Sequence, residues 1–317
     1  MDAPTFLSDA QWKDFDENGF LILENLLSSS ELNQLNQRLD DIMLGKVLYP
    51  SLLMQIDPSA TVTSSSSSSS SSSTSTPGAP PVSKTFSGGK SDDSYALANV
   101  EVAGQTLGFK GASMAYRKIG EAECGLECDD LFMGCMQKPL FRTICDRIYG
   151  KHAAISVYRS MVMSKPADSD GGGTTLPWHQ DGGEWWSLDR DPLVFVWIAL
   201  SDATKANGAV QVIRGSHKNG ILSRRGHTIS TADIKRLVED ADPNDVVDVE
   251  LKAGQAFLCH NFTVHRSGIN STPAARRGFS INYIDARTKV LDPKPPLAGS
   301  IGTPGSTFPI VFKSPFE

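Results

Sequence analysis

Two helix-start signals near the N-terminus are separated by an apolar run. Ser8 is followed three residues later by Gln11, a capping-box pattern that predicts a short helix. The run GFLILENLL at 19–27 has the apolar continuity of a strand. Ser28 and Glu31 repeat the capping box, and the helix predicted after them has four apolar side chains on one face: Leu32, Leu35, Leu39 and Ile42. We therefore expect helices around one short strand in this part of the chain.

From residue 153 onward the pattern changes to short apolar runs bounded by Gly, Pro or Asn. Residues 128–150, just before the change, have the apolar spacing of one or two helices. The later runs are rich in Val, Ile, Phe and Trp and show no alternation of strands with helices. This order predicts a mainly β fold with flanking helices, either a sandwich or a jelly-roll barrel. The predicted strands lie at 153–166, 192–203, 208–217, 245–251, 254–265 and 276–286.

Length and composition are compatible with a single domain. A chain of 317 residues with 39% hydrophobic content can bury a substantial core. We expect one domain over 1–317, with a helical part at about 8–150 and a β core at about 153–290. The serine-rich tract at 61–83 has almost nothing to bury and cannot offset chain entropy, so we interpret it as a disordered insertion.

Charge and segment composition restrict the partners and the compartment. The net charge is −6 and no basic stripe is present, which argues against a nucleic-acid partner. No apolar run approaches the roughly 18 residues of a membrane helix, no signal peptide is evident, and the terminal KSPFE is not a peroxisomal signal. Five irregularly spaced cysteines suggest a reducing environment. We expect a soluble cytoplasmic protein with a small-molecule substrate. The sequence does not indicate its oligomeric state.

The stretch LPWHQDGG at 176–183 contains the first candidate for metal chemistry. Strand residues two apart face the same side, so His179 and Asp181 can point at one cation. A neutral imidazole and a carboxylate suit Fe(II), Mn or Zn. Such pairs are common, however, and this pair becomes a site only if a third ligand lies on a neighbouring strand.

The segment FLCHNFTVHRSG supplies two candidates for that third ligand, His260 and His265. Their separation is odd, so in one regular strand they would face opposite sides. His260 shares its side with an apolar set, and His265 shares its side with Cys259, Asn261 and Thr263. A water-accessible cavity favours the second set. We therefore predict that His265 is the ligand and that His260 is a packed, hydrogen-bonded structural histidine.

Two histidines and one carboxylate leave three coordination positions open, the arrangement of non-haem Fe(II) oxygenases. An acidic co-substrate at such a centre needs a counter-charge, and two arginines begin the next predicted strand. Arg276 shares its face with Gly278, Ser280 and Asn282, whereas Arg277 shares its face with apolar residues. We predict that Arg276 points inward, where its guanidinium can pair with a carboxylate in bidentate fashion.

Three motifs together carry a family resemblance. They are PWHQD, NGAVQVIRGSHKNG, and HRSGIN with Arg276 eleven residues after His265. From about residue 10 to 290 the chain resembles the phytanoyl-CoA dioxygenase family of Fe(II)- and 2-oxoglutarate-dependent oxygenases. The resemblance implies a double-stranded β-helix, and hydroxylation of a substrate with release of succinate and CO2. It also implies dioxygen as the oxidant and ascorbate as a supporting reductant.

The resemblance further implies individual roles. His179, Asp181 and His265 would hold iron, and Arg276 would bind the distal carboxylate of 2-oxoglutarate. Halogenating members replace the carboxylate ligand by a small residue, so the carboxylate at 181 favours oxygen transfer. Three further residues match positions near the co-substrate: Ser267 as a helper to the arginine, Trp197, for which core packing is the alternative, and Lys165.

The sequence says least about the substrate. Trp185 and Trp186 could wall a substrate cavity or simply pack under a loop, and Arg224 and Arg225 could attract an anionic substrate or lie in a solvated loop. The same iron site would also serve desaturation, epimerisation or ring formation. A non-catalytic ligand-binding barrel is the alternative from another class of protein.

Overall fold

The structure is a computed structural model of the whole chain. It describes residues 5–43, 46–47, 49, 52–56, 86–87, 96–97, 101–103, 116–120, 125–165, 175–222, 228–292 and 303–316. The serine-rich tract at 61–83, Arg224 and Arg225 lie outside the described residues.

Most of the described chain lies in antiparallel β structure. One sheet has nine strands within the described residues, and all its strand pairs are antiparallel. Along the sheet the order is β1 (Phe20–Leu23), β12 (Ala256–His260), β9 (Val194–Ala199), β14 (Arg276–Asp285), β7 (Ile155–Lys165), β6 (Tyr116–Ile119), β2 (Leu53–Ile56) and β5 (Glu101–Ala103), with β15 (Ile310–Phe312) also paired to β7.

A second, smaller sheet carries the histidine motifs. Its order is β11 (Val246–Val249), β10 (Val210–Ile213), β13 (His265–Ser267) and β8 (Leu176–His179), again antiparallel throughout. A separate two-stranded ribbon consists of β3 (Phe86–Ser87) and β4 (Ala96–Leu97).

Helices flank the sheets, and their starts follow the sequence signals. The α-helices are α1 (Asp9–Asn18), α2 (Ser29–Met43), α3 (Asp130–Met136), α4 (Pro139–Tyr149) and α5 (Thr231–Ile234). The 3₁₀ turns are η3 (Leu126–Cys128), η4 (Glu184–Trp186), η5 (Lys205–Asn207), η6 (Ser216–Asn219) and η8 (Pro243–Asp245), and η7 (Lys235–Glu239) is a π-helical turn. Both predicted capping boxes are confirmed: the Ser8 and Gln11 side chains bond each other's backbone N–H, and so do those of Ser28 and Glu31.

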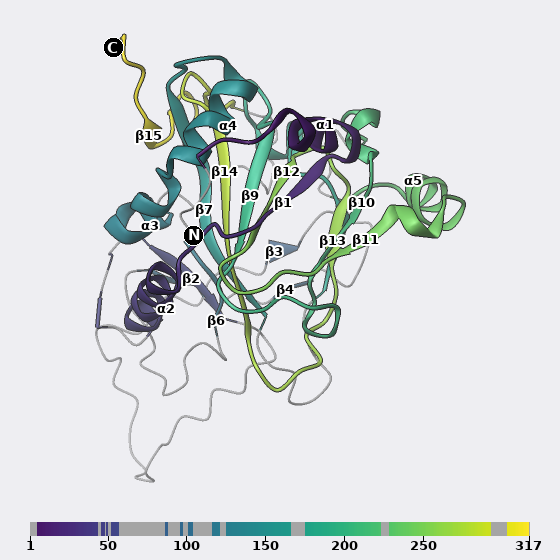
Figure 1. Cartoon of the computed structure of the whole chain (residues 1–317), viewed down its shortest axis with the longest axis horizontal. Coiled ribbons are helices and arrows are strands. Elements are labelled where there is room, and N and C mark those ends of the chain that lie inside the picture. The colour runs from purple at the N-terminus through teal and green to yellow at the C-terminus, as the bar shows by residue number, and fades with distance from the viewer. Residues whose placement is uncertain are drawn as a thin grey trace.

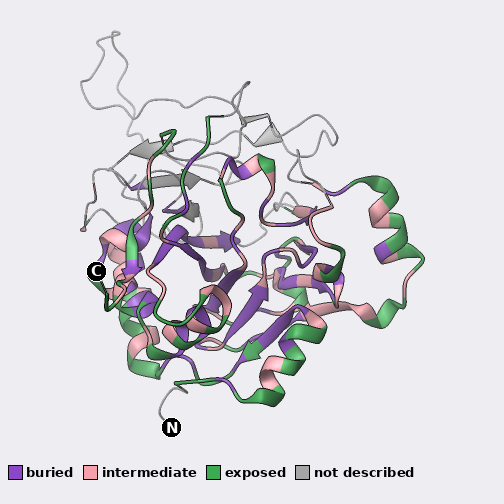
Figure 2. Ribbon diagram, turned by 90° about the horizontal axis from the view of Figure 1, so that it is seen from above, coloured by how far each residue is buried: buried purple, intermediate pink, exposed green. Residues whose placement is uncertain are grey.

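The large sheet separates two cores. The largest apolar cluster lies on the face covered by α2, α3 and α4, where Phe132 and Phe141 pack against Phe279 and Tyr283 of β14. A second cluster joins the opposite face to the small sheet, with Phe195, Trp197 and Phe257 on one side and four residues of the small-sheet side on the other: Val210, Val212, Val249 and Leu251. Figure 1 shows α2 and α3 on one side of the long strands and β10 and β13 on the other. Figure 2 shows that burial follows the strands, while the helices expose their outer faces. We call the face of the large sheet that meets the small sheet its inner face.

Three expectations about the elements need correction. The run at 254–265 is two strands: β12 ends at His260, a turn follows, and β13 begins at His265. The part predicted to be helical around one strand also contributes β2, β5 and β6 to the large sheet. The strand expected at 19–27 is only Phe20–Leu23.

Among the described residues, no helix is both long and apolar enough to span a bilayer.

Candidate metal centre

His179 and His265 stand opposite each other on paired positions of β8 and β13. Their ring centroids are 4.1 Å apart. Nδ1 of His179 lies 2.8 Å from the carbonyl oxygen of Pro177, and Nδ1 of His265 lies 2.9 Å from that of Thr263. Because a carbonyl can only accept, these contacts place the proton on Nδ1 of each ring, so Nε2 is the ring nitrogen that can bind a metal.

Asp181 completes a cluster of three potential ligands. Its Oδ1 lies 3.8 Å from Nε2 of His179, and one ligand atom from each of the three residues falls within 4.8 Å of the others. Both histidines are buried, and the Asp181 carboxylate keeps partial exposure, with 18% of its side-chain surface accessible. The cluster can therefore hold one cation while one side remains open.

Asp181 reaches this position through a turn, and not from within the strand. The strand β8 ends at His179, which corrects the expectation of a fully extended segment. The backbone N–H of Asp181 donates to the carbonyl of Asn261 at 3.0 Å. Between the two ligands, the side chain of Gln180 donates to the carbonyls of Gly220 and Phe262 and accepts from the N–H of Leu222. These bonds fix the turn that presents the carboxylate.

Arg276 lies deep in the protein on the inner face, as predicted from its parity. Only 2% of its surface is exposed, and burial lowers the pKa of its guanidinium to about 10. Nη1 donates to the carbonyl of Gly208 at 2.7 Å, and Nε has no hydrogen-bond partner. No ion pair with a carboxylate is found for it in the described part of the chain. Arg277 faces the other way and pairs with Asp40 of α2 at 2.7 Å.

The guanidinium of Arg276 rests on an aromatic floor. Its Cζ lies 4.9 Å from the ring centroid of Trp197, which is itself 3% exposed. The indole fits because Gly278, two residues after the arginine, has no side chain. A methyl group placed there would lie 1.9 Å from Cζ2 of Trp197. Trp197 is therefore packed in the core, and its ring also lies against the guanidinium of Arg276.

The two other residues predicted near the arginine are also buried on this side. Lys165 of β7 stands opposite Arg276 of β14 in the strand register. Ser267 is two residues beyond His265 on β13. The sequence reasoning missed Gly208, whose carbonyl accepts from the guanidinium and whose backbone is left-handed (φ 78°); a Cβ at this position would lie 2.8 Å from Cδ of Lys165. The turn motif Asn207-Gly208 was visible in the sequence, but its contact with the arginine was not.

The four residues predicted to line a substrate pocket differ in burial and in whether the structure describes them. Trp186 is 1% exposed and stacks on Tyr158 with ring centroids 4.6 Å apart, whereas Trp185 is only partly buried. Arg224 and Arg225 lie outside the described residues, so attraction of an anionic substrate and a solvated loop both stay open for them.

His260 has the structural environment expected for it. Its Nδ1 accepts a hydrogen bond from the N–H of Phe262 at 3.1 Å, and its ring lies 5.2 Å from that of His217. His217 in turn donates through Nε2 to the carbonyl of Asp16 at 3.1 Å. Burial lowers the pKa of His260 to about 4, so the ring is neutral at physiological pH.

Comparison with known proteins identifies the family. A family model described as phytanoyl-CoA dioxygenase (PhyH) matches residues 15–278. The chain belongs to the phytanoyl-CoA dioxygenase (PhyH) family. Membership of this family makes the protein an oxidoreductase of the dioxygenase type.

The named relatives span nearly the whole chain. Phytanoyl-CoA dioxygenase domain-containing protein 1 of Danio rerio is 27% identical over 292 residues, covering 91% of this chain and 94% of the relative. Phytanoyl-CoA dioxygenase 1 of Oryza sativa is 25% identical and covers 88% of this chain and 89% of its own length.

Solved structures share the fold at low sequence identity. The apo form of EctD from S. alaskensis has a TM-score of 0.59 at 17% identity, covering 94% of this chain and 82% of that one. The epimerase SnoN from nogalamycin biosynthesis, in complex with Fe3+, alpha ketoglutarate and nogalamycin RO, has a TM-score of 0.58 at 14% identity, covering 96% and 98%. At these identities the likeness concerns the fold alone.

Proposed function

We propose that this PhyH-family protein is an Fe(II)- and 2-oxoglutarate-dependent dioxygenase that hydroxylates a small molecule and releases succinate and CO2. One observation carries the proposal. A His179, Asp181, His265 cluster and a buried Arg276 without a carboxylate partner among the described residues lie between the same two sheets. The first suits a metal with open positions, and the second suits an acid.

The donor set fits ferrous iron. Two imidazoles, each with Nδ1 against a backbone carbonyl, and one carboxylate form the 2-His-1-carboxylate ligand set of non-haem Fe(II) oxygenases. His179, Asp181 and His265 would hold the metal, and the carbonyls of Pro177 and Thr263 would orient the two rings. Bound iron and 2-oxoglutarate would supply the activation of dioxygen.

The buried guanidinium fits the far carboxylate of 2-oxoglutarate. A buried cation is costly unless it is paired, and Arg276 has an Nε–H with no partner in the described part of the chain. A dicarboxylic acid placed between the metal and Arg276 would supply that pair. Trp197 and the carbonyl of Gly208 already fix the plane of the guanidinium, so its N–H groups are oriented before the acid binds. We assign Lys165 and Ser267 to the same co-substrate site, since both are buried.

The architecture supports the same proposal. Two antiparallel sheets that enclose an apolar cluster, with the ligands at one end of the small sheet, are what a double-stranded β-helix requires. We infer that fold for 153–290, within a single oxygenase domain. The neighbour SnoN is named an epimerase and SnoK a carbocyclase. Epimerisation and ring formation are therefore the second candidate reactions, while the carboxylate ligand Asp181 favours transfer of oxygen over transfer of halide.

The test uses the full-length protein. Under anaerobic conditions, Fe(II) plus 2-oxoglutarate should produce a weak visible charge-transfer absorption. In air, a metabolite extract should contain a compound that gains one oxygen atom while succinate is released in equal amount.

The matched variants are Asp181→Ala and Asp41→Ala, the second of which removes only a surface carboxylate that pairs with Lys46. We expect the first to lose both signals and the second to keep them. If wild type shows no absorption and no succinate with any extract, the protein is not such an enzyme. If succinate forms while the product has lost hydrogen or changed configuration, the second candidate reactions replace hydroxylation.

A further inference from the structure

The inner face of β7 and β14 has a cationic side chain near each end. At one end Lys165 is in register with Arg276, and at the other end Arg159 is in register with Asn282. Six residues separate the two pairs on both strands, which is about 20 Å of extended chain. The proposed co-substrate uses only the first end. The second end therefore has an arginine that the proposed function leaves unexplained.

The Arg159 end lies beside the metal cluster. Asn282 is in register with Phe195 of β9, and the ring centroid of Phe195 is 5.3 Å from that of His265. Side chains at directly paired positions of neighbouring strands point to the same face. Arg159, Asn282 and Phe195 thus form one row across three strands, and the row leads to a metal ligand.

Two aromatic rings support the guanidinium of Arg159. Its Cζ lies 5.1 Å from the ring centroid of Tyr158 and 5.1 Å from that of Trp186, and the two rings stack on each other. Such stacking fixes the plane of a guanidinium. Arg159 is one of only two half-buried positions on β7, all the other residues of the strand being buried.

Hydrogen-bond donors gather around this cation. Nδ2 of Asn282 and Nε1 of Trp186 are buried and have no hydrogen-bond partner among the residues that the structure describes, and the two residues are only 3% and 1% exposed. A buried donor without an acceptor costs free energy, which a ligand oxygen would recover. Two unpaired donors beside a guanidinium specify a ligand that is negatively charged and rich in acceptors.

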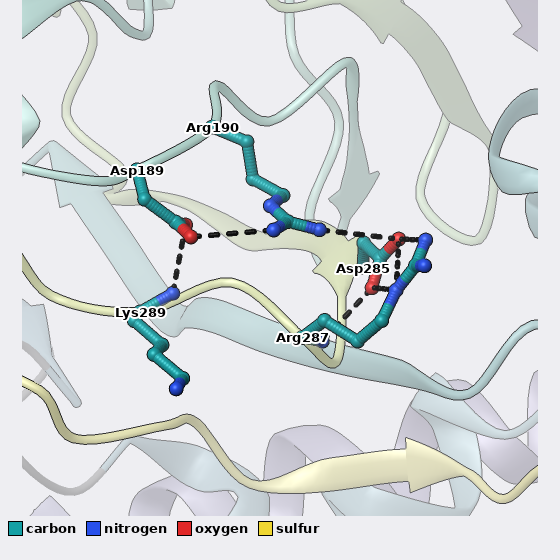
Figure 3. A network of polar contacts seen from close by, with 5 residues as sticks. All are labelled: Asp189, Arg190, Asp285, Arg287 and Lys289. Carbon is teal, nitrogen blue, oxygen red and sulfur yellow. Dashed lines mark hydrogen bonds and ion pairs between the residues drawn. The ribbon is translucent and has the colours of Figure 1, made fainter.

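The loop that contains Trp186 is fixed in place. Ser187 accepts from the N–H of Leu291 at 2.7 Å, and Asp189 accepts from the N–H of Lys289 at 2.9 Å. Figure 3 shows how Arg190 bridges Asp189 and Asp285, and how Asp285 is also held by Arg287. The end of β14 is thus tied to the loop after the HxD motif, so the aromatic support is formed before a ligand binds.

We propose that Arg159, Asn282 and Trp186 form an oxyanion site for the primary substrate, so that the substrate of this enzyme carries a carboxylate or a phosphate near the carbon that is oxidised. The inference rests on the proposed function, because it places this group relative to the metal cluster. The two ends of the inner face then have separate roles. Arg276 takes the acid of the co-substrate, and Arg159 takes the acid of the substrate.

The experiment measures binding of chemically paired probes to the full chain loaded anaerobically with Fe(II) and 2-oxoglutarate. Each carboxylic acid is compared with its primary amide by calorimetry: hexanoate with hexanamide, phenylacetate with phenylacetamide, and indole-3-acetate with indole-3-acetamide. Phenyl phosphate against phenol distinguishes a phosphate from a carboxylate. We expect at least one anion to bind about ten- to hundredfold more tightly than its neutral partner, the factor typical of a charge-assisted hydrogen bond.

Three variants locate the effect. Arg159→Gln should abolish the preference for the anion, and Arg159→Lys should retain part of it. Arg147→Gln, which removes a guanidinium that lies 5.7 Å from the Trp12 ring on the helical side, should leave it intact. The charge-transfer absorption with 2-oxoglutarate should persist in all three, since it depends on the metal ligands and on Arg276, which these substitutions leave unchanged.

The outcomes separate the two proposals. An absorption band in wild type together with equal binding of anions and neutral partners would overturn the oxyanion site and leave the proposed function standing. The same holds if Arg159→Gln keeps the full preference. A wild type without the band would overturn the proposed function, and the substrate assignment with it.

Discussion

The imidazole rings of His179 and His265 face each other at 4.1 Å between centroids, on directly paired positions of two antiparallel strands. Each ring has its Nδ1 bonded to a backbone carbonyl two residues earlier in the chain. The same short-range bond thus fixes both tautomers, and the pairing of β8 with β13 brings the two Nε2 atoms together.

This relationship separates two histidines that lie five residues apart. His265→Gln should lower affinity for Fe(II) by more than the roughly ten- to hundredfold loss seen when only an outer-shell partner is removed. His260→Gln should keep full metal occupancy, because its imidazole bonds to the backbone of Phe262. Metal content after dialysis at graded Fe(II) concentrations measures both. Loss of metal in the His260 variant with retention in the His265 variant would reverse the assignment.

The choice of His265 from the sequence agrees with the cluster, but the argument from strand parity was wrong. Parity assumed one regular strand through 254–265, whereas the chain turns after His260, where the N–H of Thr263 bonds back to the carbonyl of that residue. Phe262 and Val264 alternate with Asn261 and Thr263 through the turn as residues of a strand would, so the local pattern gave no sign of it. On β14 the strand is regular from Arg276 to Asn282, and there parity correctly separated Arg276 from Arg277.

The sequence predicted the helix-capping contacts, which are local, but not the pairing of strands that lie far apart in the chain. The capping boxes at Ser8 and Ser28 depend on residues three apart, so the sequence contains all the information that they need. The strands β2, β5 and β6 are short, and they belong to the large sheet through the pairing of β6 with β7 and of β2 with β6 and β5. Likewise, Arg159 meets Trp186 across 27 residues of chain, a contact that no local pattern shows.

Arg276 and Arg277 form a matched pair for testing the co-substrate site. Arg276→Gln should raise the KM for 2-oxoglutarate about ten- to hundredfold, because the acid loses a charge-assisted bidentate partner. Arg277→Gln should leave that KM unchanged and lower the free energy of unfolding by about 1 kcal/mol or less, since it removes an ion pair with Asp40 at the edge of α2. Initial rates of succinate release give both KM values.

A thermal measurement checks the same point without turnover. 2-Oxoglutarate added with Fe(II) under anaerobic conditions should raise the Tm of wild type and of Arg277→Gln by mass action. The Tm of Arg276→Gln should not respond. An equal rise in all three proteins would show that the acid binds elsewhere.

Gly278 is expected to control the position of Trp197. In Gly278→Ala the new methyl group would lie 1.9 Å from Cζ2 of the indole, so the ring must move from beneath Arg276. We expect the free energy of unfolding to fall by about 1–3 kcal/mol, as for other overpacked cores. The KM for 2-oxoglutarate should rise as well, because the guanidinium of Arg276 loses its contact with the Trp197 ring. Denaturant titration and succinate release measure the two effects.

Two further variants test the cause. Combining Gly278→Ala with Trp197→Phe should recover part of the lost stability, since the smaller ring makes room for the methyl group, and such coupling is the mark of a direct contact. Gly134→Ala is the control for the loss of a glycine, because a methyl group there meets nothing within 4 Å and α3 should gain stability. Strictly additive effects at residues 278 and 197 would contradict the steric explanation.

The pair His217 and His260 predicts how stability responds to acid. Burial lowers the pKa of His260 from 6.5 to about 4, and burial also lowers the pKa of His217. Between pH 6.5 and 4 the unfolded chain therefore binds a proton at residue 260 that the folded chain does not, so the free energy of unfolding falls as pH falls through this window. The contribution of His260 is up to about 3 kcal/mol, fully present above the unfolded pKa and lost below the folded one.

The variant His260→Gln isolates this contribution. It removes the titrating group, so its stability should fall less steeply than that of wild type between pH 6.5 and 4. At pH 8, where the histidine is neutral in both states, the variant should be less stable than wild type by a constant amount that reflects only lost packing and the lost bond from Phe262. Urea titrations at half-unit pH steps measure the slope. Parallel curves for the two proteins across the whole window would mean that His260 is protonated as readily in the folded protein as in the unfolded chain.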